Sequence, residues 1–475
     1  MAGSPPDPPP EAGAPPAGRL GRTARVGSLV TGQSLRWAGM RTANRLRTPE
    51  RAQEARNERT AALVDELVEQ LGRMRGAAMK LGQMISMAEL DGLPDDQRQV
   101  LQAKLAALRD DVPPMPFSEV ERVVRADLGV PLRQAFSEFD ERAVAAASIG
   151  QVHRAVTRAG DVVAVKVQYP RVAEAVETDL RNAMLLVPLL RRVAPGLDAR
   201  ALFAELRERV SEELDYELEA QHQRRIERLV RAHPFISVPR VDTALSTRRV
   251  LVTEYVEGLR FDAVSDLDEP VRDRYGEIVF RFFFGLLYRD RIALGDPHPG
   301  NYLLRSDGRV AFLDFGLLRD VSAERVGAER ALARAARDRD AAGLMAALTA
   351  AGYLPADRAQ DSDPELVLRM VRRASRWYAV PGRHRFGGGQ PGRDRHREAG
   401  DEERSARARE QVHRFTMPAD AVLIRRMHGI VAVVLGRLRA AADWGAIAAE
   451  YLHGAAPATD LGESEAIFLA ARGRS

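Results

Sequence analysis

The stretch Gly295-Asp296-Pro297-His298-Pro299-Gly300-Asn301, followed by Asp314-Phe315-Gly316, decides how the rest of the chain is interpreted. An Asp with an Asn five positions later, and a second Asp opening Asp-Phe-Gly, is the catalytic layout of phosphoryl-transfer enzymes. Asp296 would orient or deprotonate the attacking group, while Asn301 and Asp314 would hold Mg²⁺ against a triphosphate. The alternative is that two turn-rich loops flank a hairpin, since Asp, Asn, Gly and Pro all favour turns.

Composition sets the broad class of the protein. The chain has 475 residues, 45% of them hydrophobic and 29% charged, enough for two or three domains or one two-lobed domain. It has no cysteine, which excludes disulfides, thiolate catalysis and cysteine-based metal sites. The net charge of +4 is small and predicts no nucleic-acid surface. Without a secretory signal or an apolar run of about eighteen residues, we expect a cytoplasmic protein that can lie against the inner face of a membrane.

Lysine is rare in this chain. Of 71 basic residues, the lysines are Lys80, Lys104 and Lys166, and the others are arginines. An ammonium on a flexible stem and a planar guanidinium are not interchangeable, so a lysine kept in such a chain indicates a chemical requirement. Chance survival is the alternative, and it suits Lys104, which lies in an ordinary helical pattern.

The first 115 residues are predicted to form a tail and a helical extension. Residues 1–48 combine a disordered Pro-rich tail with a basic lead-in, which suits either a membrane-surface helix or a solvated segment. Residues 49–115 show helical periodicity and carry Lys80-Leu81-Gly82-Gln83. A glycine within a helix costs roughly 1 kcal/mol relative to alanine unless something must approach closely. Lys80 is therefore a candidate functional residue.

Residues 116–257 are predicted to form a smaller lobe built on strands. The segment Val163-Ala164-Val165-Lys166-Val167 matches the kinase strand whose lysine contacts the α and β phosphates, although an alternating strand with one solvent-facing lysine is the alternative. The loop from Ala145 to Gln151 stands where protein kinases have a glycine-rich loop. Its three alanines restrict φ and add bulk beside the nucleotide, so we expect nucleotide handling to differ from that of a standard kinase.

Two further segments of this lobe belong to the predicted site. A helical pattern from residue 199 to residue 231 holds Glu213 and Glu219, either of which could pair with Lys166, although charged helix faces are usually just solvated. The segment Thr253 to Gly258 follows an apolar strand and suits an interlobe hinge whose backbone would bind adenine. The residues predicted to contact the nucleotide are Ala145, Ala146, Ala147, Ser148, Ile149, Gly150, Gln151, Lys166, Glu254 and Val256.

Residues 258–475 are predicted to form a helical lobe that carries the catalytic loop. A buried helix over residues 275–294 precedes that loop, and a hairpin of residues 302–304 and 309–313 brings Asp296 near Asp314. No Ala-Pro-Glu follows, so the substrate-docking segment of protein kinases is missing or altered. Residues 382–409 are predicted to be a mobile loop, and residues 418–452 return to a helical pattern.

The motifs and their order along the chain resemble those of the UbiB/AarF family of atypical kinases, over about residues 50 to 350. The resemblance implies an α+β, two-lobed protein-kinase-like fold with an N-terminal helical extension and a helical C-terminal lobe. It also implies that Lys80 lies near the carboxylates of the ExD motif and restricts protein phosphorylation. The motifs are Lys80-Leu81-Gly82-Gln83 (KxGQ), Ala145 to His153, Val163 to Lys166, Glu213-Leu214-Asp215 (ExD), Asp296 to Asn301 and Asp314-Phe315-Gly316.

The chain departs from the family pattern at one place. Many members have His-Ala before the first catalytic Asp, whereas this chain has Leu294-Gly295. The departure loosens whatever support the His gives and leaves the metal and nucleophile positions intact.

The resemblance implies an atypical kinase or ATPase that uses ATP or ADP with Mg²⁺ and supports isoprenoid-lipid or ubiquinone-type metabolism at a membrane surface. A lipid or quinone precursor would be its second ligand, and the sequence does not set the oligomeric state. Two alternatives remain open at this point. One is a small-molecule kinase of the aminoglycoside-phosphotransferase type, against which the Ala-rich loop and the Lys80 motif argue. The other is a nucleotide-gated scaffold without useful turnover.

Overall fold

A computed structural model describes residue 51 and residues 115–147, 149–184, 207, 211–212, 214–295, 297–379, 382–386, 411 and 414–473. The chain divides into two compact units. The first comprises residues 1–123, 143–151 and 168–214, and the second comprises residues 124–142, 152–167 and 215–475. In the first unit, the described elements include β2 (Ala145–Ala147), α7 (Val172–Met184) and the start of α5 (Phe117–Leu128).

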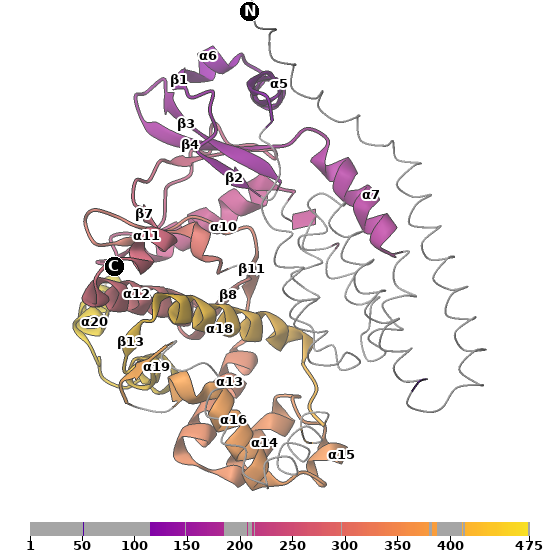
Figure 1. Ribbon diagram of the computed structural model, residues 1–475, viewed down its shortest axis with the longest axis vertical. Coiled ribbons are helices and arrows are strands. Elements are labelled where there is room, and N and C mark those ends of the chain that lie inside the picture. The colour runs from indigo at the N-terminus through magenta and orange to yellow at the C-terminus, as the bar shows by residue number, and fades with distance from the viewer. Residues whose placement is uncertain are drawn as a thin grey trace, which may run out of the picture. The chain divides into compact units, whose positions relative to one another are not determined.

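An antiparallel sheet carries the predicted nucleotide lysine (Figure 1). Its strand order is β1 (Phe136–Phe139), β3 (Gly150–Thr157), β4 (Val162–Gln168) and β6 (Val250–Glu254), and β2 pairs with β3. A turn joins β3 to β4, with Gly160 at φ +91°. In β4, the valines 163, 165 and 167 are buried, whereas Lys166 is only partly buried. Since strand side chains alternate, Lys166 lies on the face opposite the valine core.

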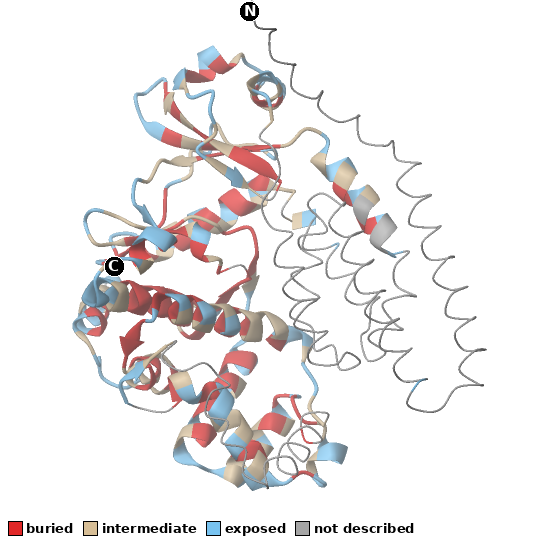
Figure 2. Cartoon of the chain, viewed as in Figure 1, coloured by how far each residue is buried: buried red, intermediate tan, exposed pale blue. Residues whose placement is uncertain are grey.

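The rest of the second unit is mainly helical. Its long helix α12 (Glu269–Tyr288) is buried from Tyr275 to Tyr288, as Figure 2 shows by its red ribbon. Aromatic rings fill the space around it: Phe282 stacks on Phe312 at 3.7 Å between ring centroids, and Phe280 lies 4.0 Å from Phe284. The other named helices in the described part of this unit are α6 (Leu132–Ala135), α10 (Tyr216–Leu229), α11 (Phe261–Ser265), η1 (Pro299–Asn301), α13 (Ala323–Asp338), α14 (Ala341–Ala350), α15 (Ala356–Ala359), α16 (Pro364–Ala379), α18 (Ala419–Leu438), α19 (Trp444–His453) and α20 (Asp460–Arg472).

Short strands hold the two predicted catalytic loops. The predicted hairpin is confirmed as β9 (Tyr302–Leu304) against β10 (Val310–Phe312), within a sheet ordered β5 (Ile236–Ser237), β10, β9 and β7 (Leu259–Arg260). A separate ribbon pairs β8 (Ile292–Leu294) with β11 (Leu318–Asp320), and another pairs β12 (His384–Arg385) with β13 (Ala441–Ala442). The β8–β11 ribbon therefore lies directly beside both Gly295 and the segment that follows Gly316.

Three predicted helices are corrected by the structure. The helix predicted over residues 275–294 ends at Tyr288, because Arg291 adopts a left-handed backbone (φ +57°) and β8 follows. The pattern over residues 199–231 is interrupted, because Asp215 is extended and accepts hydrogen bonds from the first turn of α10 as its N-cap. The pattern over residues 418–452 divides into α18 and α19, since Arg439 ends α18 with φ +52°.

Among the helices in the described part of the chain, none combines the length and apolar character needed to cross a bilayer.

Candidate nucleotide site

An ion pair between Lys166 and Glu219 is the centre of the candidate site. The Lys166 Nζ lies 2.8 Å from both Oε1 and Oε2 of Glu219. The Lys166 side chain is 22% exposed and that of Glu219 is 5% exposed, so water screens the pair only in part. The Lys166 ammonium also lies 4.7 Å from the centroid of the Tyr216 ring. Of the two carboxylates that the sequence left open, Glu219 is the one observed against Lys166.

The environment of Lys166 favours the protonated form of its side chain. Burial alone lowers the pKa of this ammonium, but the nearby Glu219, Tyr216 and Asp314 outweigh burial and raise the pKa above its ordinary value. Lys166 is therefore positively charged at neutral pH. A permanent cation in this position is suited to binding a phosphate group.

One face of α10 contacts three parts of the site. Glu219, His222 and Arg225 recur at three-residue spacing, which places them along one side of a helix. The His222 Nδ1 lies 3.0 Å from the carbonyl oxygen of Phe315, and because a carbonyl only accepts, this nitrogen carries the proton. Arg225 pairs with both carboxylate oxygens of Asp320 in β11, at 3.1 Å for one of them. The helix thus ties Lys166 to the Asp-Phe-Gly segment and to β11.

Asn301 and Asp314 lie side by side, as the hairpin predicts. The Asn301 Nδ2 donates to Asp314 Oδ2 at 3.2 Å, and the backbone N–H of Gly316 donates to Asp314 Oδ1 at 3.0 Å. The two contacts fix the carboxylate. An amide oxygen and a carboxylate on adjacent residues are hard donors of the kind that Mg²⁺ prefers, so these residues fit the predicted metal.

The structure gives a reason for glycine at position 295, where the chain departs from the family pattern. A Cβ added to Gly295 would lie 2.0 Å from Leu317 Cδ2 and 2.9 Å from Leu423 Cδ1. The Gly295 N–H also donates to the Leu317 carbonyl oxygen at 2.9 Å, which extends the β8–β11 pairing by one step. Two leucine side chains therefore fill the space beside this segment, and only glycine fits between them.

The predicted hinge is an extended segment that follows β6. Glu254 is the last residue of the strand, and its N–H donates to Arg240 O at 2.8 Å. Within the described residues, the Val256 N–H makes no backbone hydrogen bond. At Gly258, a Cβ would lie 2.7 Å from the Leu304 carbonyl oxygen, so glycine allows the chain to pass closely over β9. The geometry leaves the Val256 amide available to a ligand.

The Ala-rich segment is part of the first unit. Ala145 to Ala147 form β2, and Gly150 and Gln151 begin β3. Ile149 is 4% exposed, and its carbonyl oxygen accepts from the Tyr169 N–H at 2.9 Å. The Gln151 Oε1 accepts from the Met115 N–H at 2.8 Å. The segment is thus partly strand, and the side chains of Ile149 and Gln151 are buried.

Four of the predicted site residues lie outside the described residues. They are Lys80, Ser148, Glu213 and Asp296.

Comparison with known proteins agrees with the sequence motifs. The family model for the ABC1 atypical kinase-like domain matches residues 107–348, about half of the chain. The chain belongs to the UbiB/AarF family of atypical kinases. The match covers β4, α10, the hinge, the β9–β10 hairpin and the Asp-Phe-Gly segment. The predicted α+β protein-kinase-like fold is thereby confirmed.

Family relatives include characterised and solved proteins. The chain is 32% identical over 260 residues to "Atypical kinase COQ8B, mitochondrial" of Danio rerio, covering 54% of this chain and 41% of the relative. It is 33% identical over 313 residues to "Atypical kinase coq-8, mitochondrial" of Caenorhabditis elegans, covering 64% and 41%. The chain thus spans about two fifths of the length of these relatives.

A solved structure matches most of the chain. It is described as the complex structure of Rv3197-erythromycin from Mycobacterium tuberculosis, with a TM-score of 0.57 and 29% sequence identity. The match covers 83% of this chain and 98% of that one. The likeness to this solved chain therefore extends beyond the half of the sequence that the family model matches.

Sequence reasoning missed His222, Arg225 and Asp320. His222 and Arg225 could have been predicted, because they follow Glu219 at helical spacing and so lie on the same face of the helix. The partner of Arg225 was not predictable in the same way, since β11 is a three-residue strand with no strong pattern.

Proposed function

We propose that the chain is an atypical kinase or ATPase that binds Mg-ATP or Mg-ADP. The observation that carries the proposal is the Lys166–Glu219 pair, formed in the same unit as the Asn301–Asp314 pair. An ion pair between a strand lysine and a helix glutamate, together with an Asp-Phe-Gly carboxylate, is the arrangement that phosphoryl transfer requires.

Each residue has a role in this proposal. Lys166 binds the α and β phosphates, and Glu219 holds its ammonium in place. Asn301 and Asp314 would hold Mg²⁺, which would neutralise charge on the phosphates. The Glu254 carbonyl and the Val256 N–H bind the adenine edge. Asp296 positions the attacking group, which is water in an ATPase and a hydroxyl in a kinase.

Two further segments have roles in the choice of nucleotide and in the access of protein substrates. Ala145 to Gln151 have less backbone freedom than a glycine-rich loop, and in this proposal they alter the preference between ATP and ADP. Lys80 has the role of restricting access of protein substrates. The activity serves isoprenoid-lipid or quinone metabolism at the inner face of a membrane, with the chain bound peripherally.

The proposal is tested with Asp314→Asn, which removes a full negative charge from the metal position and keeps the side-chain shape. We expect Mg²⁺-dependent nucleotide binding, followed by a fluorescent ATP analogue, to weaken at least about tenfold, and ATP hydrolysis to fall further. Asp357→Asn, at an exposed position on α15, is the matched control and should behave as the wild type. If the wild type binds no Mg-nucleotide, or if the two variants behave alike, the proposal is wrong.

A further inference from the structure

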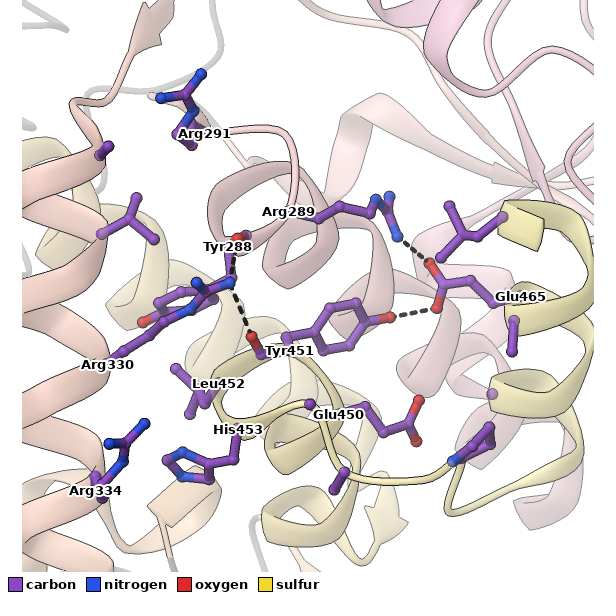
Figure 3. Close-up of a pocket in the computed structure, with 18 residues that line it drawn as sticks. Tyr288, Arg289, Arg291, Arg330, Arg334, Glu450, Tyr451, Leu452, His453 and Glu465 are labelled. Atoms are coloured by element: carbon purple, nitrogen blue, oxygen red, sulfur yellow. Dashed lines mark hydrogen bonds and ion pairs between the residues drawn. The ribbon is translucent and has the colours of Figure 1, made fainter. Parts of the chain in front are cut away.

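A second cavity lies in the helical part of the second unit, bordered by α12, α13, α19 and α20 (Figure 3). Its volume of about 740 Å³ is in the range of small-molecule sites. Four residues of α13 line it, namely Ala323, Val326, Arg330 and Arg334, which lie on one side of the helix. The nucleotide-site residues are not among those that line it.

The two carboxylates that line this cavity are already neutralised. Glu450 accepts from Nη1 and Nη2 of the fully buried Arg281, at 2.8 and 2.9 Å. Glu465 accepts from Arg281 at 3.2 Å, from Arg289 at 2.8 Å and from the Tyr451 hydroxyl. The two acids, Arg281, Arg289 and Tyr451 thus form one network, and Figure 3 shows the contacts of Glu465 with Arg289 and Tyr451.

The opposite side carries the guanidinium groups of Arg330 and Arg334. The Nη2 of Arg330 donates to the carbonyl oxygens of Tyr288 and Tyr451, at 2.7 and 3.3 Å, and its buried Nε has no hydrogen-bond partner. Arg334 lies one turn further along α13, facing His453 (Figure 3). Among the described residues, neither guanidinium forms an ion pair. Like charges four residues apart on a helix repel each other, so an anion between them would be stabilising.

We propose that this cavity binds a phosphate ester that carries an apolar group. Arginine binds phosphate through the N–H groups of its planar guanidinium, and Arg330 and Arg334 both line the cavity. The cavity is far larger than a phosphate ion, and Val326, Leu452 and Leu469 give it an apolar wall. The two arginines therefore bind the phosphate, and Val326, Leu452 and Leu469 contact its apolar substituent.

The position of the cavity couples it to the nucleotide site. Arg291 and Ala323 line the cavity and flank one end of the β8–β11 ribbon, where the Val321 N–H donates to Arg291 O at 2.8 Å. The other end of the ribbon continues into Gly295 and Leu317, next to the catalytic loop and Asp-Phe-Gly. A ligand that shifts this ribbon changes nucleotide affinity. This coupling, unlike the binding itself, rests on the proposed function.

Binding is tested by titration calorimetry of the full chain with hexyl phosphate and with inorganic phosphate. We expect hexyl phosphate to bind at least about tenfold more tightly, because only it contacts the apolar wall. Arg334→Gln should weaken binding about tenfold, and Arg330→Lys, which keeps the charge but loses the planar guanidinium, should also weaken it. Arg369→Gln removes an exposed arginine from α16, outside the cavity, and should have no effect.

The outcomes separate the parts of the inference. No saturable binding of hexyl phosphate, or equal affinities for Arg334→Gln and Arg369→Gln, would overturn the site. Retention of the wild type, but not of Arg334→Gln, on phosphatidylcholine vesicles containing phosphatidic acid identifies a lipid phosphate as the source. Binding of hexyl phosphate without such retention identifies a soluble ester. If hexyl phosphate binds and Mg-nucleotide affinity is unchanged, the coupling is wrong. Binding of hexyl phosphate with no nucleotide binding at all refutes the proposed function alone.

Discussion

At the scale of single residues, the Lys166–Glu219 pair can be tested directly. Glu219→Gln keeps the side-chain volume and removes the charge that opposes Lys166. Since an exact position of the ammonium matters for phosphate binding, we expect kcat/KM for ATP hydrolysis to fall about 10- to 100-fold. Glu217→Gln, exposed on the same helix turn, should leave the kinetics unchanged. Equal kinetics for the two variants would show that the pair has no role in the activity.

Gly295 provides a second test at this scale. Gly295→Ala places a Cβ 2.0 Å from Leu317 Cδ2, so the leucine must move or the β8–β11 ribbon must shift. We expect a loss of about 1–3 kcal/mol in the free energy of unfolding, measured by denaturant titration. Adding Leu317→Ala creates room for the new methyl group, so the double variant should lose less than the sum of the single losses. Simple additivity would contradict the proposed clash.

At the scale of elements, α10 is the part that joins the site together. His222→Ala removes the hydrogen bond to the Phe315 carbonyl while Glu219 and Arg225 remain. We expect a stability loss of about 1 kcal/mol and a larger effect on kcat than on KM, because the Asp-Phe-Gly segment loses its tether. His222→Gln, which keeps an N–H donor, should restore part of kcat. Arg224→Ala, exposed on another face of α10, is the control.

The sequence predicts which of these residues lie together better than it predicts the bounds of the elements that hold them. Lys166, Asn301 and Asp314 could be predicted because their chemistry demands particular side chains at particular spacings. The start of α10 could not, since helical periodicity continues through Asp215, which instead turns its side chain back to cap the helix. The end of α12 could not be predicted for a related reason. Residues 292–294 form a short apolar run, which suits either a buried helix or a buried strand. They form a strand because they pair with β11.

At the scale of the whole molecule, a buried charge network sets how stability depends on pH. Although burial opposes it, the nearby His233, the charge of Arg289 and the hydrogen bonds from Tyr451 and Arg289 lower the pKa of Glu465 from 4.5 to about 2. A carboxyl whose folded pKa is depressed stabilises the fold above its unfolded pKa. This contribution is lost as the pH falls from about 4.5 to about 2.

Glu465→Gln tests this dependence. The variant leaves Arg281 and Arg289 with less opposing charge in a buried setting, so we expect a loss of about 3 kcal/mol at neutral pH. Its free energy of unfolding should also fall less steeply than that of the wild type between pH 4.5 and 2. Denaturant titrations across this range measure both effects, and Glu463→Gln, exposed on the same helix, is the control. Parallel pH profiles for wild type and Glu465→Gln would contradict the assignment.

The Lys166–Glu219 pair has one more consequence, which concerns covalent labelling. A protonated amine is not a nucleophile, so an acylating reagent should modify Lys166 slowly for as long as Glu219 and its neighbours hold the proton in place. Movement of α10 away from β4 would remove that restraint and leave burial to lower the pKa. With only Lys80 and Lys104 as other lysines in the chain, peptide mass spectrometry can follow this one amine without ambiguity. The rarity of lysine thus makes acylation of Lys166 a direct report on the position of α10.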